Sequence, residues 1–139
     1  MTTLHLHVRL AASRDEVWAV VGDFGRLDAW HPFVPNCRLQ EDGVTRVIAG
    51  GGTRTIEVLD PEATARNAHT YTIQQSPIPV TGYRATLSVS DEGASGCTVH
   101  YQSSFQPASG VPEVVVRALL WFFFWVAFRS LERRFGARR

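Results

Sequence analysis

The chain has 139 residues, enough for a buried core, and we expect a single domain over residues 1–139. Hydrophobic residues make up 45% and charged residues 19% of the chain, which is ordinary for a globular protein. The formal net charge of +1 provides no field that would gather nucleic acid, so we set aside nucleic-acid-binding proteins as a class.

The cysteines and the N-terminal residues indicate the cellular compartment in which we expect the protein. Cys37 and Cys97 are far apart in the sequence, and we expect both to be buried free thiols. The N-terminal residues lack the basic segment and apolar run of a secretory signal. These features predict a cytoplasmic protein.

A strand and two short helical segments are expected first. Residues 4–10 alternate between apolar and polar side chains, which is typical of a half-buried strand. Ser13 and Glu16 have the spacing of a capping box, so a short helix should begin there. A single helical turn around residues 26–30 should follow, before Pro32 prevents its continuation.

The middle of the chain is predicted to form six short strands. Segments with alternating apolar residues are separated by turn-forming pairs and triplets rich in glycine, aspartate and proline. Together with the first strand they indicate a seven-stranded antiparallel meander. The six predicted strands are residues 38–41, 44–48, 53–59, 69–74, 83–89 and 97–105.

The last element is predicted to be one long helix over residues 111–135. From residue 114 to 128 it would span roughly 22 Å, short of the roughly 30 Å of a bilayer core, so we do not expect it to cross a membrane. Residues 118–128 contain no polar side chain, so the face turned away from the sheet needs a ligand cavity, a homodimer partner, a membrane surface or the rest of the chain to cover it. Arginines at its C-terminal end suit either the helix dipole or a membrane surface. They are Arg129, Arg133, Arg134, Arg138 and Arg139.

The predicted elements are, in order, a strand, two short helices, six strands and a long helix. This order, together with a set of particular residues, is similar to that of a known family. Those residues are Val17-Trp18, Asp23-Phe24, Trp30-His31-Pro32, Cys37, Glu57, Leu59, Asp60, Tyr71, Pro79-Val80 and Tyr83-Arg84-Ala85. The chain thereby resembles the START/Bet v 1-like (SRPBCC) superfamily, and within it the bacterial polyketide cyclase/dehydrase-like branch. The resemblance implies an α+β helix-grip fold, in which a seven-stranded antiparallel sheet curls around the C-terminal helix and leaves a cavity.

The same landmarks are similar to the plant abscisic-acid receptors, which belong to this superfamily. By that similarity, His31 stands where the receptors carry a lysine that binds the ligand carboxylate. The chain lacks the receptors' own gate and latch sequences, so we do not expect their hormone or their phosphatase partner. The similarity places a mobile gate loop at Gly50, Gly51 and Gly52 and a latch at Ser76, Pro77 and Ile78.

Three residues are candidates for proton transfer. His31 titrates near neutral pH and would either act at the edge of the pocket or cap the short turn at its outer rim. Glu57 would be buried and need Arg46 or Arg84 as partner if its side of the strand faces inward, and would be solvated otherwise. The Tyr83 hydroxyl would donate to a ligand carbonyl, or the residue would be a core tyrosine.

An aromatic lining with a few polar groups is predicted around these candidates, although simple core packing explains each aromatic residue equally well. The predicted ligand-binding residues are Trp30, Phe33, Arg46, Tyr71, Pro79, Arg84, Tyr101, Trp121 and Trp125.

Three functions remain open. The sequence has no phosphate loop, dinucleotide fingerprint, serine nucleophile elbow or closed metal quartet, so we expect no cofactor and no metal. The first hypothesis is an enzyme that cyclises or dehydrates a small hydrophobic oxygenated molecule, of polyketide or terpenoid type, by proton transfer. The second is a non-catalytic carrier or sensor of such a ligand, and the third is an interaction module that dimerises or contacts a membrane through the terminal helix.

Overall fold

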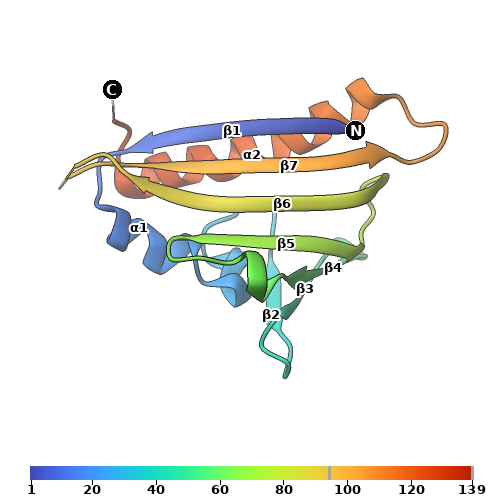
Figure 1. The fold of residues 1–139 in the computed structure, drawn as a ribbon, viewed down its shortest axis with the longest axis horizontal. Coiled ribbons are helices and arrows are strands. Elements are labelled where there is room, and N and C mark those ends of the chain that lie inside the picture. Colours follow the sequence, from blue (N-terminus) through green and yellow to red (C-terminus); the bar gives the residue numbers. More distant parts are fainter. Residues whose placement is uncertain (94, 139) are drawn as a thin grey trace.

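The computed structural model describes residues 1–93 and 95–138, so Arg139 of the predicted arginine cluster lies outside the described residues. Seven antiparallel strands form one sheet in the order β1-β7-β6-β5-β4-β3-β2 (Figure 1). From β2 to β7 each strand pairs with the next in the sequence, and β1 joins the sheet beside β7. The strands are β1 (Thr2–Leu10), β2 (Asn36–Leu39), β3 (Thr45–Gly50), β4 (Thr53–Leu59), β5 (Ala68–Gln75), β6 (Val80–Asp91) and β7 (Cys97–Pro107).

Two short helical elements follow β1, as predicted, and one long helix ends the fold. The first begins at the expected capping box, in which the Ser13 hydroxyl accepts from the Glu16 backbone N–H at 3.2 Å and Glu16 Oε1 accepts from the Ser13 N–H at 3.4 Å. The helical elements are α1 (Arg14–Val21), the 3-10 helices η1 (Phe24–Ala29) and η2 (Pro61–Ala63), and α2 (Glu113–Phe135).

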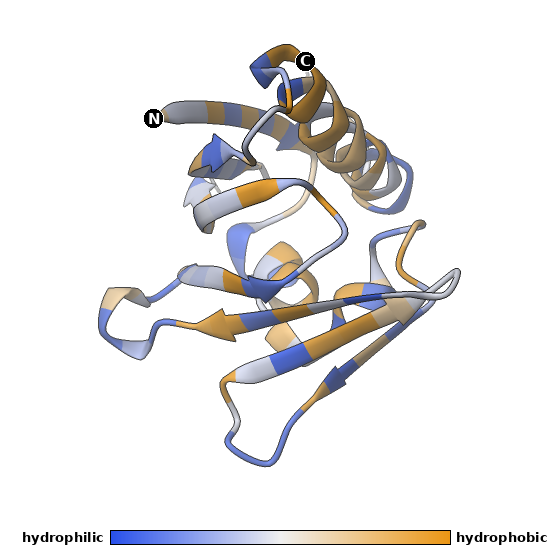
Figure 2. Cartoon of the chain, turned by 90° about the vertical axis from the view of Figure 1, so that its right-hand side faces the viewer, coloured by the Kyte–Doolittle hydropathy of each residue, from blue (hydrophilic) through white to orange (hydrophobic). Residues whose placement is uncertain are grey.

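The long helix α2 covers only one part of the sheet. It packs against β1 and β7, while β5, β4, β3 and β2 bend away from it (Figures 1 and 2). The pairing register shifts at Ile56/Glu57 in β4 and at Thr81/Arg84 in β6, and such bulges bend strands. The result is the predicted α+β helix-grip fold, with a space between α2 and the bent strands.

Alternating side chains build the core beneath α2. Along β1 buried and exposed residues alternate without a break, as the period of two predicted. The buried side of α2, which includes Val116, Leu120, Phe124 and Leu131, rests on this surface. Cys37 and Cys97 are both buried free thiols, as expected.

The chain after α2 returns to β1, which lies at one edge of the sheet. The Arg138 backbone N–H donates to the Arg9 carbonyl at 3.1 Å, and the Ala11 N–H donates to the Gly136 carbonyl at 2.8 Å. Near the other end of β1, Arg117 Nη1 donates to the Thr3 carbonyl at 2.7 Å. Helix α2 is therefore held to β1 at both of its ends.

The expected gate loop is a tight hairpin turn. Gly50 belongs to β3 and pairs with Thr53, so only Gly51 and Gly52 connect the two strands. Their φ values are +58° and +79°, the left-handed pair that a two-residue hairpin turn requires. Gly51 and Gly52 therefore form the turn itself, at the position predicted for the gate loop.

Candidate functional site

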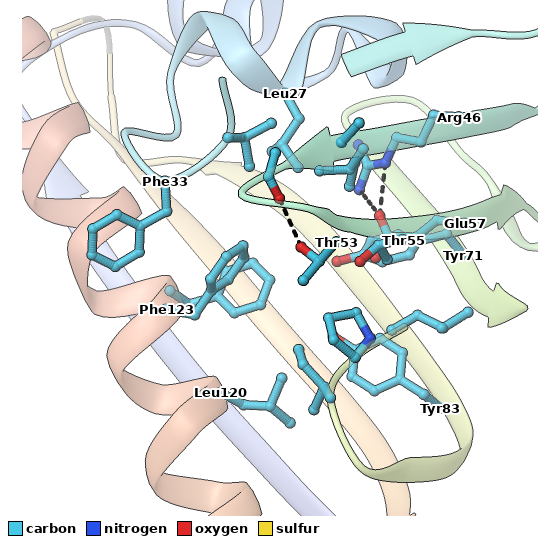
Figure 3. A pocket seen from close by; sticks show the side chains of 18 of the residues that line it. Leu27, Phe33, Arg46, Thr53, Thr55, Glu57, Tyr71, Tyr83, Leu120 and Phe123 are labelled. Atoms are coloured by element: carbon cyan, nitrogen blue, oxygen red, sulfur yellow. Dashed lines mark hydrogen bonds and ion pairs between the residues drawn. The ribbon is translucent and has the colours of Figure 1, made fainter. Parts of the chain in front are cut away.

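A cavity of about 270 Å³ lies between α2 and the bent strands β3–β6. Its volume is close to the lower end of the about 300–1,000 Å³ found for small-molecule sites. Figure 3 shows Phe33, Leu120 and Phe123 on the helix side, and Arg46, Glu57, Tyr71 and Tyr83 on the sheet side. The principal lining residues are Leu27, Trp30, Phe33, Arg46, Ile48, Thr53, Thr55, Glu57, His69, Tyr71, Ile73, Pro77, Ile78, Tyr83, Leu120, Phe123 and Phe124.

An ion pair forms part of the cavity wall. Arg46 Nε and Nη2 donate to Glu57 Oε1 at 2.7 and 2.6 Å, and Arg46 Nη1 donates to the Phe24 carbonyl at 3.1 Å. Neighbouring positions on paired strands place the two side chains together, since Arg46 lies opposite Glu57 in the β3–β4 register. The inward register of Glu57 is confirmed, and Arg46 is the partner that the sequence offered beside Arg84.

Aromatic rings hold the Arg46 guanidinium in place. Its carbon lies 4.0 Å from the centroid of the Phe24 ring and 4.9 Å from that of the Tyr71 ring. Burial by itself lowers the pKa of Arg46, but the adjacent Glu57 carboxylate outweighs this and raises the pKa above its usual value. Arg46 therefore stays charged beside the Glu57 carboxylate.

Buried tyrosines lie behind and beside the ion pair. Tyr71 and Tyr83 line the cavity, and the Tyr83 hydroxyl is hydrogen-bonded to that of Tyr101. Burial raises the pKa of all three tyrosines, with the Glu57 carboxylate adding to the effect. They remain protonated at neutral pH and can supply hydroxyl groups, not phenolates, to a ligand.

His31 lies behind the cavity wall and does not line it, which corrects the prediction of a proton-transfer group at the pocket edge. Its ring is 1% exposed and packs 3.9 Å, centroid to centroid, from Phe123 of α2. Its Nδ1 accepts from the Phe33 backbone N–H at 3.2 Å, as the alternative of a turn-capping histidine requires. Burial lowers the pKa of His31 to about 4, so the ring is neutral near pH 7.

His69 also lines the cavity, although it is not among the residues predicted for the site. Its ring is 3% exposed and lies 5.4 Å from the Phe24 ring and 6.0 Å from the Tyr71 ring, centroid to centroid. Burial, assisted by the charge of Arg46, lowers its pKa to about 3. His69 alternates with Tyr71 and Ile73 along β5, and this pattern is the signal in the sequence that could have identified it.

Several predicted lining residues lie elsewhere. Trp121 and Trp125 are on the outer side of α2 and are 48% and 41% exposed. Arg84 points outward and pairs with Asp60, with 2.8 Å between its Nη2 and the Asp60 Oδ2. Pro79 is absent from the lining, and Tyr101 contributes from behind, through Tyr83. Residues 118–128 of α2 are apolar on all sides, so the sequence did not distinguish the inner aromatic residues of the helix from the outer ones.

The predicted gate and latch segments contribute to the cavity lining. Gly50, Pro77 and Ile78 line the cavity, whereas Gly51, Gly52 and Ser76 do not. The Ser76 hydroxyl accepts from the Ile78 backbone N–H at 3.1 Å and so shapes the connection between β5 and β6. Both connections are therefore at the cavity, and the latch segment contributes the apolar side chains.

Thr53, Thr55 and Phe123 line the cavity without having been predicted to do so. The two threonines precede Glu57 at intervals of two on β4, so they lie on the same side of the strand as Glu57. Phe123 sits within an unbroken apolar run, where no pattern in the sequence singles it out.

The chemistry available in the cavity is hydrogen bonding within apolar walls. Oε1 of Glu57 is engaged by Arg46, and no hydrogen bond within residues 1–93 and 95–138 reaches Oε2. The hydroxyl groups of Tyr71, Thr53 and Thr55 are further polar groups of the lining. Among the described residues, no group of three histidine, cysteine, aspartate or glutamate side chains is placed to hold a metal ion.

Comparison with known proteins agrees with this geometry. A family model described as polyketide cyclase/dehydrase and lipid transport matches residues 1–129. No curated protein matches the chain.

Solved structures share the fold over nearly the whole chain. The protein XoxI from Bacillus cereus is 26% identical, with a TM-score of 0.87 and coverage of 97% of this chain and 96% of that one. A START superfamily protein from Mycobacterium smegmatis is 20% identical, with a TM-score of 0.79 and 96% coverage of both chains. The di-domain ARO/CYC BexL from the BE-7585A biosynthetic pathway is 17% identical, with a TM-score of 0.78 and coverage of 96% of this chain and 46% of that one. The last two likenesses are likenesses of fold.

Proposed function

Because the chain belongs to the polyketide cyclase/dehydrase and lipid transport family, we propose that it binds a small, hydrophobic, oxygen-bearing molecule in the cavity between α2 and β3–β6. One observation carries the proposal: an apolar, aromatic cavity has a neutralised ion pair and tyrosine hydroxyls in its wall. Apolar walls favour a hydrophobic body, and the few polar groups set its orientation.

The ion pair also specifies the charge of the ligand. Arg46 and Glu57 cancel one another in a buried setting, where an additional unpaired charge is costly. A carboxylate ligand would bring a second negative charge next to Glu57, whereas a hydroxyl group would donate to Oε2 of Glu57. The favoured ligand is therefore neutral and carries a hydroxyl group.

A matched series of probes tests this proposal. Naphthol, naphthalene and naphthoate share one aromatic body and differ in the hydroxyl and the charge. We expect naphthol to bind most tightly in a titration followed by tryptophan fluorescence, because Trp30 lines the cavity. Naphthoate binding as tightly as naphthol would contradict the charge argument.

Two variants on one strand locate the binding site. Thr55 lines the cavity and Arg54 points to the other side of β4. Thr55→Trp should fill the cavity and abolish naphthol binding, while Arg54→Trp should bind as the wild type does. Equal binding by both variants would place the probe outside the cavity. Independently of these variants, native mass spectrometry of the purified protein would identify a natural ligand that co-purifies with it.

Cyclisation or dehydration of the bound molecule is the second candidate, and Glu57 is the observation that favours it. Its carboxylate lines the cavity and has Oε2 free of hydrogen bonds within the described part of the chain. In such a reaction the carboxylate takes a proton from a carbon next to a carbonyl, and the resulting enolate forms a carbon–carbon bond with a second carbonyl. The carboxyl group returns the proton to the new alkoxide, and loss of that hydroxyl group with a second proton from the former enolate carbon releases water. A tyrosine hydroxyl polarises the acceptor carbonyl through a hydrogen bond.

Acetonylacetone tests the catalytic candidate, because its cyclisation to methylcyclopentenone can be followed by absorbance. An enzyme should accelerate the reaction, and Glu57→Gln should remove the acceleration while Arg54→Trp keeps it. Acceleration that persists in Glu57→Gln would exclude Glu57 as the base. Naphthol binding without any acceleration would favour a carrier or sensor.

A further inference from the structure

The outer side of α2 carries most of the large hydrophobic side chains that the described chain exposes. We define the apolar face as Val114, Val115, Leu119, Trp121, Phe122 and Trp125, which are between 41% and 72% exposed. Figure 2 shows hydrophobic colouring along most of the length of α2. Scattered exposed hydrophobic residues are ordinary, but a continuous set on one helix marks an interaction surface.

The apolar face is continuous with an exposed residue of the cavity lining. Phe33 lines the cavity and is itself 51% exposed. Its ring centroid lies 5.8 Å from that of Phe122 on the apolar face and 6.4 Å from that of Phe123, which lines the cavity. An aromatic path therefore leads from the outer side of α2 to the binding site.

Arginines continue the same side of the helix beyond the apolar face. Arg129 and Arg133 follow Trp125 at intervals of four, which keeps them on one side of an α-helix. Both are exposed, and the carboxylate near them, Glu132, is 3.3 Å from Arg129 Nη1. The outer side of α2 thus has an aromatic section with adjacent positive charge.

This charge distribution disfavours a second copy of the chain as the covering partner. Antiparallel pairing of two α2 helices would bury Arg129 and Arg133 against Val114 and Val115. Parallel pairing would bring the arginines of the two copies together. Each arrangement desolvates or opposes cations, whereas an anionic surface would pair with them.

The helix is long and apolar enough to cross a membrane by length and composition. However, its other side forms the core through residues such as Val116, Leu120 and Phe128, which are at most 4% exposed. Crossing a bilayer would remove these side chains from the sheet, while lying in the interface leaves the core intact.

We propose that the apolar face of α2 docks on the surface of an anionic lipid bilayer and turns the exposed Phe33 side of the cavity toward the lipid. The tryptophan and phenylalanine side chains enter the interface, and Arg129 and Arg133 contact the negatively charged headgroups. A hydrophobic ligand then moves between the bilayer and the cavity past Phe33 without crossing water. The docking itself does not depend on which ligand the cavity holds.

Co-sedimentation with vesicles tests the docking. We expect the protein to sediment with phosphatidylcholine vesicles that contain phosphatidylserine, and much less with phosphatidylcholine alone. Arg129→Glu combined with Arg133→Glu should weaken binding to the anionic vesicles by at least about 30-fold, as expected from the loss of two cations near a charged surface. Raising the salt concentration should weaken the wild type in the same direction.

A second pair of changes tests the apolar contribution. Leu119→Ser combined with Trp125→Ser should weaken vesicle binding by at least about 10-fold, because two large apolar groups no longer enter the interface. Leu39→Ser is the matched control, since Leu39 is 43% exposed on β2, outside the apolar face, and it should leave vesicle binding unchanged. Circular dichroism confirms that each variant is folded.

The outcomes separate the docking from the proposed ligand binding. The docking is overturned if the wild type ignores anionic vesicles, or if the arginine and apolar variants bind them as the wild type does. A dimer of the wild type in sedimentation equilibrium, which the Leu119→Ser and Trp125→Ser changes dissociate, would also overturn the docking if the wild type does not bind vesicles. Naphthol binding in solution does not require vesicles, so its loss would count against the cavity proposal alone.

Discussion

Arg46 and Glu57 are the residues on which the interior depends most. Removing one partner of a buried ion pair leaves an uncompensated charge, so we expect Arg46→Met to lower the free energy of unfolding by about 3–5 kcal/mol. Arg46→Met combined with Glu57→Leu should cost much less, because both charges leave together. Urea denaturation of the two variants measures the difference. A double variant as unstable as the single one would show that the pair is required for packing itself.

The histidines give the protein a predictable response to acid. Burial lowers the pKa of His31 to about 4 and that of His69 to about 3, from 6.5 in the unfolded chain. As the pH falls below 6.5 the unfolded state takes up protons first, so stability is lost between about pH 6.5 and the folded-state values. At pH 4 the loss should be on the order of 3 kcal/mol for each histidine.

Urea midpoints at pH 7 and pH 4 measure this loss. Replacing His69 with Gln should reduce the difference between the two midpoints, since the glutamine does not titrate. His7→Gln on the exposed side of β1 is the control, and it should retain the acid sensitivity of the wild type. An unchanged difference in His69→Gln would mean that other groups dominate the acid response.

At the scale of elements, the hairpin between β3 and β4 depends on left-handed backbone at Gly51 and Gly52. Gly51→Val should lower stability by about 1–2 kcal/mol, because a β-branched residue does not fit positive φ. Gly51→Asn is the matched comparison and should cost little, since asparagine is common at this position of the turn. Thermal unfolding of both variants provides the measurement, and equal losses would contradict the assigned turn.

Local patterns predicted most of the elements, and they did so for physical reasons. The alternation in β1 and β4 and the capping box at Ser13 are short-range features, which are visible in the sequence. Such patterns could not distinguish the inner side of α2 from its outer side. Phe122 and Phe123 are chemically identical, and only the packing of the helix on the sheet makes one exposed and the other a lining residue. The same limit misplaced Trp121 and Trp125 in the cavity lining.

The site is assembled from segments that are far apart in the sequence. Alternation along the strands predicted inward positions for Tyr71 and Tyr83 and left Glu57 open between an inward and a solvated position, and all three residues line the cavity. The sequence could not predict that His31 lies behind that wall, because its depth is set by α2, about 90 residues later in the chain. How deeply a side chain is buried depends on the packing of segments that are distant in the sequence. Alternation indicates only which side of a strand a residue faces.

Ligand binding should stabilise the entire fold. A ligand that binds only the folded state at a hundred times its dissociation constant adds about 2.7 kcal/mol, which corresponds to a rise in Tm of roughly 10 °C for a protein of this size. We expect naphthol to raise the Tm of the wild type in differential scanning calorimetry. Thr55→Trp, with its cavity filled, should show no such rise. A rise of equal size in the variant would indicate binding elsewhere.

The attachments of α2 and the C-terminal segment to β1 have a consequence for solubility. A border strand with free backbone groups invites another chain to extend the sheet, which is a common route to aggregation. Here the carbonyls of Thr3 and Arg9 and the N–H of Ala11 are already occupied by Arg117, Arg138 and Gly136. Removing the residues after α2 should therefore unmask part of this border and make the truncated protein polymerise through its strands at concentrations where the intact chain stays dispersed.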